Sequence, residues 1–205
     1  MPEFYHNLIT EKSFKILQDL RKKFEFILIG GWAVFLYSGA LKSKDIDIII
    51  DYDELQKLKN DYDVFKNDRL KKYEIKIEEI DVDIYLPYFS KLGLKAEEIQ
   101  EHRQNLEGFS VPIPEVLLIL KINAYRERKG SNKGEKDLID IFSLLKNSAT
   151  NWAKYKELIR KYNIEDLNEE FKNLISSQKR VPELDLSDHR IAKLKKDILA
   201  QISDI

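Results

Sequence analysis

Aspartates recur in pairs in two stretches of the sequence that are otherwise rich in isoleucine and valine. Asp45 and Asp47 lie in KDIDIII, and Asp81 and Asp83 lie in IDVDIYL. Successive side chains of a strand point to opposite faces, so the two aspartates of each pair share a face and the apolar residues point into the core. Because an isolated carboxylate on a buried strand is costly, each pair predicts a cation beside it.

A divalent metal is the cation that this arrangement favours. If the two strands are neighbours, three or four carboxylates converge on one place. Hard oxygen ligands at that density suit Mg²⁺, which binds through a few carboxylates together with waters and substrate phosphates. We therefore expect a site for Mg²⁺, or for Mn²⁺ in its place, at these aspartates.

Two glycines upstream predict a site for phosphate. A short apolar strand over 26–29 stops at Gly30-Gly31, and a helix-like stretch over 32–41 follows at once. A helix that opens there presents backbone N–H groups to an anion, and glycine lets the phosphate approach closely. A tight turn is the alternative for the glycines, and a solvated strand face is the alternative for each aspartate pair. The combination of all these features favours a nucleoside triphosphate bound with its metal.

This combination resembles the nucleotidyltransferase superfamily of the DNA polymerase β type, whose pattern is hG[GS], then Dh[DE]h, then a third h[DE]h strand. The matching residues, within 26–86, are Ile29-Gly30-Gly31, Asp45-Ile46-Asp47-Ile48, and either Val82-Asp83-Ile84 or Ile80-Asp81-Val82. The resemblance implies an enzyme that transfers an NMP group from an NTP to an acceptor hydroxyl and releases pyrophosphate.

The same resemblance implies a role for each matching residue. Asp45 and Asp47 bind both metals, and a third carboxylate completes the site and helps to deprotonate the acceptor. Asp83 is favoured over Asp81 as that third ligand, because the third acid of the family tends to lie well inside its strand. The residues expected to contact the phosphates are Gly30, Gly31 and Ser43.

A second group of charged residues lies further along, in LLILKINAYRERKGSNKGEKDLIDIFSLL. Lys121 interrupts an apolar helical run, so its stem faces the core and its ammonium needs an anionic partner. Asp137 and Asp140 lie one turn apart on the next expected helix. The stretch is also similar to the C-terminal motif of AbiEii/MenT-type nucleotidyltransferases, which implies that Lys121, Asp137 and Asp140 belong to the nucleotide site and that Lys121 reaches the triphosphate. A structural ion pair between the two helices is the alternative.

Basic residues bracket the loop between these two helices: Arg126, Arg128, Lys129, Lys133 and Lys136. They form either a solvated face or a local basic lip for the triphosphate or an RNA end. The resemblance to AbiEii/MenT-type toxins of toxin–antitoxin systems implies RNA, in particular tRNA, as the acceptor. A small-molecule acceptor is an alternative, and so is a nucleotide-binding or antitoxin-like module without catalysis.

The pattern of apolar residues predicts an α/β fold in two parts. Residues 1–110 are expected to form a nucleotidyltransferase core with a small mixed β-sheet flanked by helices, and residues 111–205 an all-helical region that completes the nucleotide and acceptor site. The elements expected are helices over 10–24 (capped by Thr10), 53–68, 114–129 and 135–146, strands over 45–50 and 73–86 (interrupted at Glu78-Glu79), and helical structure over 152–205 with a break near Pro182.

The amino-acid composition limits the kinds of site and partner that the protein can have. The 35 Lys and Arg residues against 36 Asp and Glu give a net charge of −1, so nucleic-acid binding would need a local basic patch. The absence of cysteine excludes disulfides, zinc–thiolate sites and cysteine nucleophiles. No signal peptide is recognised, and no apolar stretch approaches the ~18 residues of a membrane span. We therefore expect a cytoplasmic protein with no membrane contact, and the heavy use of Lys, Glu and Ile is typical of thermophiles.

Overall fold

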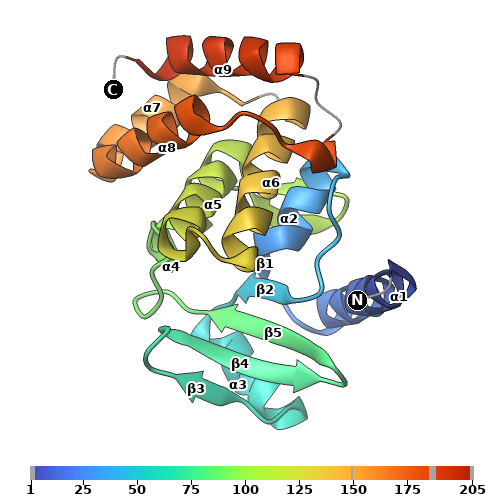
Figure 1. Ribbon diagram of the computed structural model, residues 1–205. Coiled ribbons are helices and arrows are strands. Elements are labelled where there is room, and N and C mark those ends of the chain that lie inside the picture. The colour runs from blue at the N-terminus through green and yellow to red at the C-terminus, as the bar shows by residue number, and fades with distance from the viewer. Residues whose placement is uncertain (1–2, 149, 185–187, 204–205) are drawn as a thin grey trace. The chain divides into compact units, whose positions relative to one another are not determined.

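The computed structural model describes residues 3–148, 150–184 and 188–203 (Figure 1). The chain divides into two compact units, Met1–Ile113 and Pro114–Ile205. The boundary expected from the sequence, after residue 110, lies just before the observed one. The first unit contains a mixed β-sheet with helices and the second is helical, so the predicted α/β fold class is confirmed.

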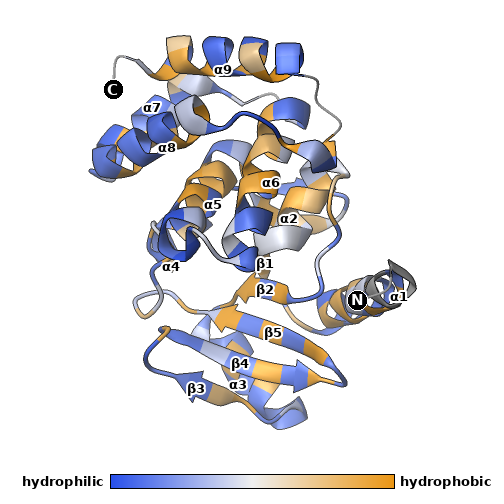
Figure 2. Ribbon diagram, in the orientation of Figure 1, coloured by the Kyte–Doolittle hydropathy of each residue, from blue (hydrophilic) through white to orange (hydrophobic). Residues whose placement is uncertain are grey.

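A seven-stranded mixed sheet forms the first unit, in the order β3-β4-β5-β2-β1-β7-β6. The strands are β1 (Ile27–Ile29), β2 (Ile46–Ile49), β3 (Phe65–Asn67), β4 (Lys72–Ile77), β5 (Ile80–Tyr85), β6 (Arg103–Leu106) and β7 (Phe109–Pro112). The central strand β2 runs antiparallel to β1 and parallel to β5. On one face of this centre Ile46, Ile48, Val82 and Ile84 are fully buried, and hydrophobic and hydrophilic positions alternate along β5 (Figure 2).

The helices of the first unit are α1 (Glu3–Lys23), α2 (Gly30–Ser38), α3 (Tyr52–Asp61) and α4 (Ala96–Gln100). The prediction that Thr10 caps the first helix is wrong. α1 begins at Glu3, and Thr10 is buried inside it with its hydroxyl donating to the carbonyl of Asn7 at 3.0 Å. α2 is anchored to α1 because the indole N–H of Trp32 donates to Ser13 Oγ at 2.9 Å.

Three strands escaped prediction: β3, β6 and the short strand β7. The side chains of β3 and β6 lack the apolar alternation that identifies a strand. The helix expected over 53–68 ends at Asp61, and β3 follows it with mostly exposed side chains. β6 is likewise exposed along most of its length, and it forms an antiparallel hairpin with the short strand β7. The interruption predicted at Glu78-Glu79 is confirmed: these residues form the β4–β5 turn, where Glu78 has a φ of 55°.

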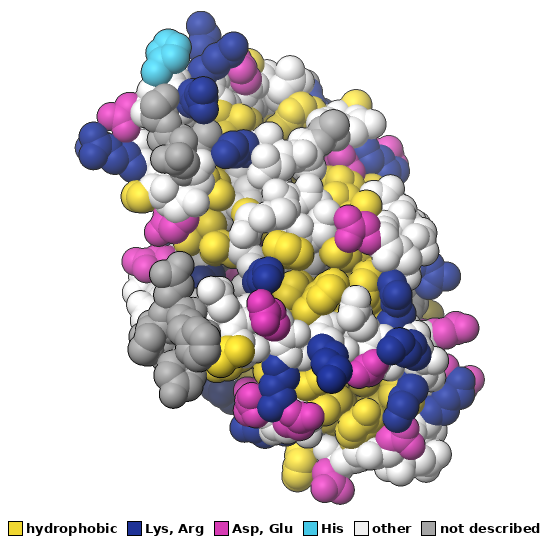
Figure 3. All heavy atoms as spheres, turned by 90° about the vertical axis from the view of Figure 1, so that its right-hand side faces the viewer, with side chains coloured by type: hydrophobic (Ala, Val, Ile, Leu, Met, Phe, Trp, Pro, Cys, Tyr) yellow, Lys and Arg dark blue, Asp and Glu magenta, His cyan; other side chains and the backbone are white. Residues whose placement is uncertain are grey.

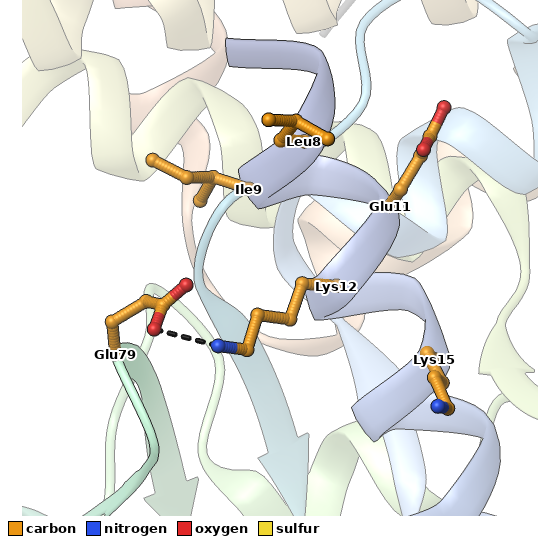
Figure 4. A pocket seen from close by; sticks show the side chains of 6 residues that line it. All are labelled: Leu8, Ile9, Glu11, Lys12, Lys15 and Glu79. Atoms are coloured by element: carbon orange, nitrogen blue, oxygen red, sulfur yellow. Dashed lines mark hydrogen bonds and ion pairs between the residues drawn. The ribbon is translucent and has the colours of Figure 1, made fainter. Parts of the chain in front are cut away.

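Lys12 of α1 contacts the β4–β5 turn (Figure 4). Its Nζ forms ion pairs with Glu78 and Glu79 and lies 2.6 Å from Glu79 Oε2. A surface pocket beside this contact is lined by the same lysine and glutamate together with Leu8 and Ile9, among others. The pocket contains none of the predicted site residues.

The second unit is built from α5 (Pro114–Arg128), α6 (Asn132–Asn147), α7 (Trp152–Lys161), α8 (Glu165–Ser177) and α9 (Asp188–Ile202), with a short 3₁₀ turn at Pro182–Leu184. The predicted helical pattern and its break near Pro182 are confirmed for the described residues. Among the described residues of both units, no helix is long and apolar enough to cross a membrane.

A tight turn joins α5 to α6. α6 begins at Asn132, earlier than predicted, and Ser131 caps it by accepting a hydrogen bond from the N–H of Gly134 at 3.1 Å. A Cβ added to Gly134 would lie 2.3 Å from the carbonyl oxygen of Arg128. The close approach of two backbone segments therefore requires glycine at this position.

We expect Gly134→Ala to destabilise the protein by about 1–3 kcal/mol, because the new methyl group forces the turn open. Helix propensity alone predicts the opposite sign, a gain of about 1 kcal/mol for alanine. Urea denaturation measures the free energy of unfolding. Lys133→Ala, at an exposed position of the same turn, serves as the control, and a stabilised Gly134→Ala variant would contradict the packing argument.

Candidate active site

Asp47 and Asp83 lie opposite each other on neighbouring strands. The parallel pairing of β2 with β5 places Asp47 in register with Asp83 and Ile46 in register with Val82. Because strand side chains alternate between faces, both carboxylates project from the same face of the sheet, away from the buried isoleucine and valine. Adjacent strands are only about 4.8 Å apart, so this register brings the two carboxylates together.

Asp45 lies in the bend before β2, outside the strand expected to include it, and its side chain is exposed. Its charge nevertheless acts on Asp83. Burial is the main influence that raises the pKa of Asp83, an ion pair with Lys72 opposes it, and the negative charges of Glu74 and Asp45 raise the pKa further. Asp45 therefore acts on Asp83 through its charge, although it lies outside the strand.

The structure separates the two candidates for the third acid. Asp81 is well exposed and forms a loose ion pair with Lys76 at 3.8 Å. It precedes the residues of β5 that are paired with β2, since β2 begins at Ile46 opposite Val82. Asp83 is less exposed and lies beside Asp47. The geometry thus favours Asp83 over Asp81.

The two glycines are required by the side chains of the site itself. Gly30 opens α2 with a φ of +67°, and an added Cβ would lie 2.1 Å from Asp47 Oδ2. An added Cβ on Gly31 would lie 2.9 Å from Ser43 Oγ. The structure therefore brings both glycines, Ser43 and Asp47 together. The N–H groups at the start of α2 are placed beside the carboxylates, an arrangement that suits an anion bound with a cation.

Lys72 of β4 is a site residue that was not predicted from the sequence. Its Nζ lies 2.6 Å from Asp83 Oδ2 and 2.9 Å from Glu74 Oε1, and only 12% of its side chain is exposed. Burial acts to lower the pKa of Lys72, but the hydrogen bonds to the two carboxylates outweigh it and raise the pKa. The signal available in the sequence was the alternation KYEIK, which places Lys72 and Glu74 on the same face as the aspartates of β5.

Tyr85 is a second neighbour of the carboxylates that was not predicted from the sequence. Its hydroxyl donates to Asp47 Oδ1 at 3.5 Å, a long hydrogen bond between adjacent strands. Because residues 83 and 85 share a face of β5, the phenol and the carboxylate of Asp83 flank Asp47 from the same strand. Tyr85 therefore limits the orientations open to Asp47.

The fit to a divalent metal follows from the kind of ligands present. Within the described ranges, no three acidic or histidine side chains are grouped so that they could hold a metal ion by themselves. Asp45, Asp47 and Asp83 nevertheless supply the carboxylate oxygens that Mg²⁺ prefers, and Mg²⁺ is commonly held by one or two carboxylates with waters and substrate phosphates. The residues thus fit a metal that is bound jointly with a phosphate ligand.

In the second unit, Lys121 forms a buried cluster with two aspartates of α6. Its Nζ lies 2.5 Å from Asp140 Oδ2 and 3.3 Å from Asp137 Oδ1, and all three side chains are at most one-tenth exposed. Burial raises the pKa of Asp140, and the charge of Lys121 opposes this. The ion pair between helices, the structural alternative, is therefore present. Contact of Lys121, Asp137 and Asp140 with a nucleotide stays a prediction.

The basic loop is largely neutralised within the same unit. Arg126 pairs with Asp166 at 2.7 Å and Lys129 with Glu170 at 3.0 Å, while Arg128 lies 3.6 Å from Asp137. On the face drawn in Figure 3, Lys and Arg side chains are likewise interspersed with Asp and Glu. The local positive charge is smaller than the sequence suggested.

No protein-family model matches the sequence, and no curated protein matches it at a significant level. Two solved structures from Helicobacter pylori are similar over nearly the whole chain. One, provisionally described as a nucleotidyltransferase, is 14% identical, with 100% of this chain and 98% of that chain covered and a TM-score of 0.54. The other, JHP933, is 15% identical, with 96% and 93% covered and a TM-score of 0.53.

A polyadenylate synthase of Megavirus is 17% identical over 72% of this chain, with a TM-score of 0.47, and the match spans 32% of its length. At such identities the Helicobacter matches show the fold: the chain shares it with a protein described as a nucleotidyltransferase. The fold expected from the motif resemblance is therefore confirmed, and the finer resemblance to AbiEii/MenT-type enzymes stays a prediction.

We expect Gly30→Ala to destabilise the protein more than Gly39→Ala does. The two glycines have nearly equal φ values, 67° and 65°, so each substitution meets the same backbone strain of about 1–2 kcal/mol. Only at Gly30 does the new Cβ collide with a side chain, since nothing lies within 4 Å of the Cβ position at Gly39. Urea denaturation compares the two, and equal losses of stability would contradict the contact with Asp47.

We expect Lys121→Met to lower the free energy of unfolding by about 3–5 kcal/mol, because it leaves the buried carboxylate of Asp140 without its lysine and that of Asp137 with only the more distant Arg128. Lys129→Met is the matched control, since it removes an exposed ion pair of the same loop region and should change stability very little. Similar unfolding midpoints for Lys121→Met and the wild type would show that the buried cluster does not stabilise the helical unit.

Proposed function

We propose that this protein is a Mg²⁺-dependent nucleotidyltransferase, which transfers an NMP group from an NTP to an acceptor hydroxyl and releases pyrophosphate. The observation that carries the proposal is the register of Asp47 with Asp83, next to the start of α2 at Gly30. The fold shared with a protein described as a nucleotidyltransferase supports it.

We assign different residues of the chain to the phosphates and to the divalent cation. The N–H groups at the start of α2, from Gly30 and Gly31, bind the phosphates with help from Ser43. Asp45, Asp47 and Asp83 are the ligands for the divalent cation. When bound, the cation neutralises phosphate charge and activates the attacking oxygen.

In this mechanism Asp83 accepts the proton of the acceptor hydroxyl. As that proton leaves, the acceptor oxygen bonds to the α-phosphorus and the bond from phosphorus to pyrophosphate breaks. A carboxylate whose pKa is raised by burial holds a proton more readily than an ordinary aspartate, which suits a general base. Without a bound cation, Lys72 pairs with one oxygen of this carboxylate.

The acceptor that we propose is RNA, with tRNA as the first species to test. The resemblance to AbiEii/MenT-type toxins supports this choice. The basic loop supports it less than the sequence suggested, because Arg126 and Lys129 are paired within the helical unit. A small-molecule acceptor is the alternative in the same assay.

A nucleotide-binding module without catalysis is the second candidate function. The ion pair between Lys72 and Asp83 favours it, because a carboxylate held by a lysine is not free to bind a metal through both oxygens. NTP binding that is independent of Mg²⁺ and leads to no turnover would distinguish this module from an enzyme.

We expect the wild-type protein to label an acceptor when it is incubated with α-³²P-labelled NTPs, Mg²⁺ and total tRNA. Asp45→Asn, Asp47→Asn and Asp83→Asn should each reduce the rate by about 100-fold or more, because each removes a ligand of the reacting phosphate's metal. Gel electrophoresis and pyrophosphate release measure transfer.

Asp81→Asn is the matched control, because Asp81 lies on the same strand and face as Asp83 but is exposed. It should retain near wild-type activity. Transfer that survives Asp45→Asn combined with Asp47→Asn would refute the mechanism, and loss of activity in Asp81→Asn with retention in Asp83→Asn would reverse the assignment of the third ligand.

A further inference from the structure

We propose that Lys72 is an internal counterion that competes with divalent cations for Asp83, so that the site binds metal weakly alone and more tightly together with a nucleotide. The inference rests on the proposed function, since it assumes that Asp83 is a metal ligand. It adds a positioning residue and a mode of regulation to that site.

The ammonium of Lys72 is held by a network that spans three strands. It contacts Asp83 on β5 at 2.6 Å and Glu74 on its own strand at 2.9 Å. Glu74 lies opposite Asp83 in the antiparallel β4–β5 pair, and the side-chain amide of Asn67 on β3 donates to Glu74 Oε1 at 3.0 Å. The Lys72 side chain is 12% exposed, whereas those of Asp83 and Glu74 are 23% and 38% exposed, so the lysine is largely buried while its carboxylate partners stay partly open to solvent.

The charges on this face explain why such a lysine would control metal binding. Asp45, Asp47, Asp83 and Glu74 are acidic, and Lys72 neutralises part of their charge while occupying one oxygen of Asp83. A free divalent cation that approaches Asp83 meets a positive charge close by in a partly buried setting, where repulsion is weakly screened. The phosphates of a nucleotide add negative charge that offsets this repulsion, so metal and nucleotide are expected to bind together.

Lys76 provides an internal comparison on the same strand. It lies four residues along and on the same face, and it pairs with Asp81 at 3.8 Å. Both of these side chains are 64% exposed, against 12% for Lys72 and 23% for Asp83. Solvent screens the ion pair between Lys76 and Asp81. Lys76 therefore has the same charged group as Lys72 but lies at an exposed position away from Asp83.

The test is a titration with Mn²⁺ followed by electron paramagnetic resonance, with and without α,β-methylene ATP as a nucleotide that does not react. Without nucleotide, we expect Lys72→Met to bind Mn²⁺ about tenfold more tightly than the wild type, because one nearby positive charge is gone. With nucleotide, the difference should shrink to within about threefold. Lys76→Met should match the wild type in both conditions.

Lys72→Arg restores the positive charge and is expected to return the affinity toward that of the wild type, which separates the charge from any general effect of substitution on the fold. Unchanged or weaker Mn²⁺ binding by Lys72→Met would overturn the role of Lys72 and leave the proposed function standing. If the wild type binds no Mn²⁺ with nucleotide, or if Asp47→Asn binds it as the wild type does, the metal site itself is overturned.

Discussion

The repulsion between carboxylates on β2 and β5 is the constraint on which the rest of the site depends. The register of Asp47 with Asp83 is fixed by the apolar residues on the opposite face, since a slip of one residue would turn Ile46 and Val82 to the wrong side. The hydrophobic core therefore holds two negative charges together. Such an arrangement is stable only where cations are supplied, by the chain or by a ligand.

The strands on either side of β2 and β5 accommodate these carboxylates in different ways. β1 ends where α2 begins, and the glycine at that junction gives Asp47 room that any larger residue would take. β4 brings the ammonium of Lys72 to Asp83, and β3 supports it through Asn67 and Glu74. In this strand order, Gly30 leaves room for the side chain of Asp47, and Lys72 provides a counterion for Asp83.

The sequence was sufficient where side chains alternate strongly between apolar and polar. Ile80 to Tyr85 reads as a strand from its pattern alone, and the same pattern assigns its two aspartates to one face. β3 and β6 could not be found this way, because at the edge of a sheet few side chains are buried. Lys72 was missed for a related reason: its partner Asp83 is 11 residues away, and only the strand pairing shows that they meet.

Lys121 and Lys72 form similar ion pairs in different surroundings. Lys121 and Lys72 each hold two carboxylates, but the Lys121 cluster lies between packed helices with all members at most one-tenth exposed. Removing its charge leaves buried anions that no solute can easily reach, so its main effect is on stability. Lys72 lies on a strand face beside partly exposed carboxylates. A cation from solution can reach these carboxylates, so the accessibility of the partner carboxylates, rather than the ion pair itself, distinguishes the expected effect of Lys121 on stability from the proposed effect of Lys72 on metal binding.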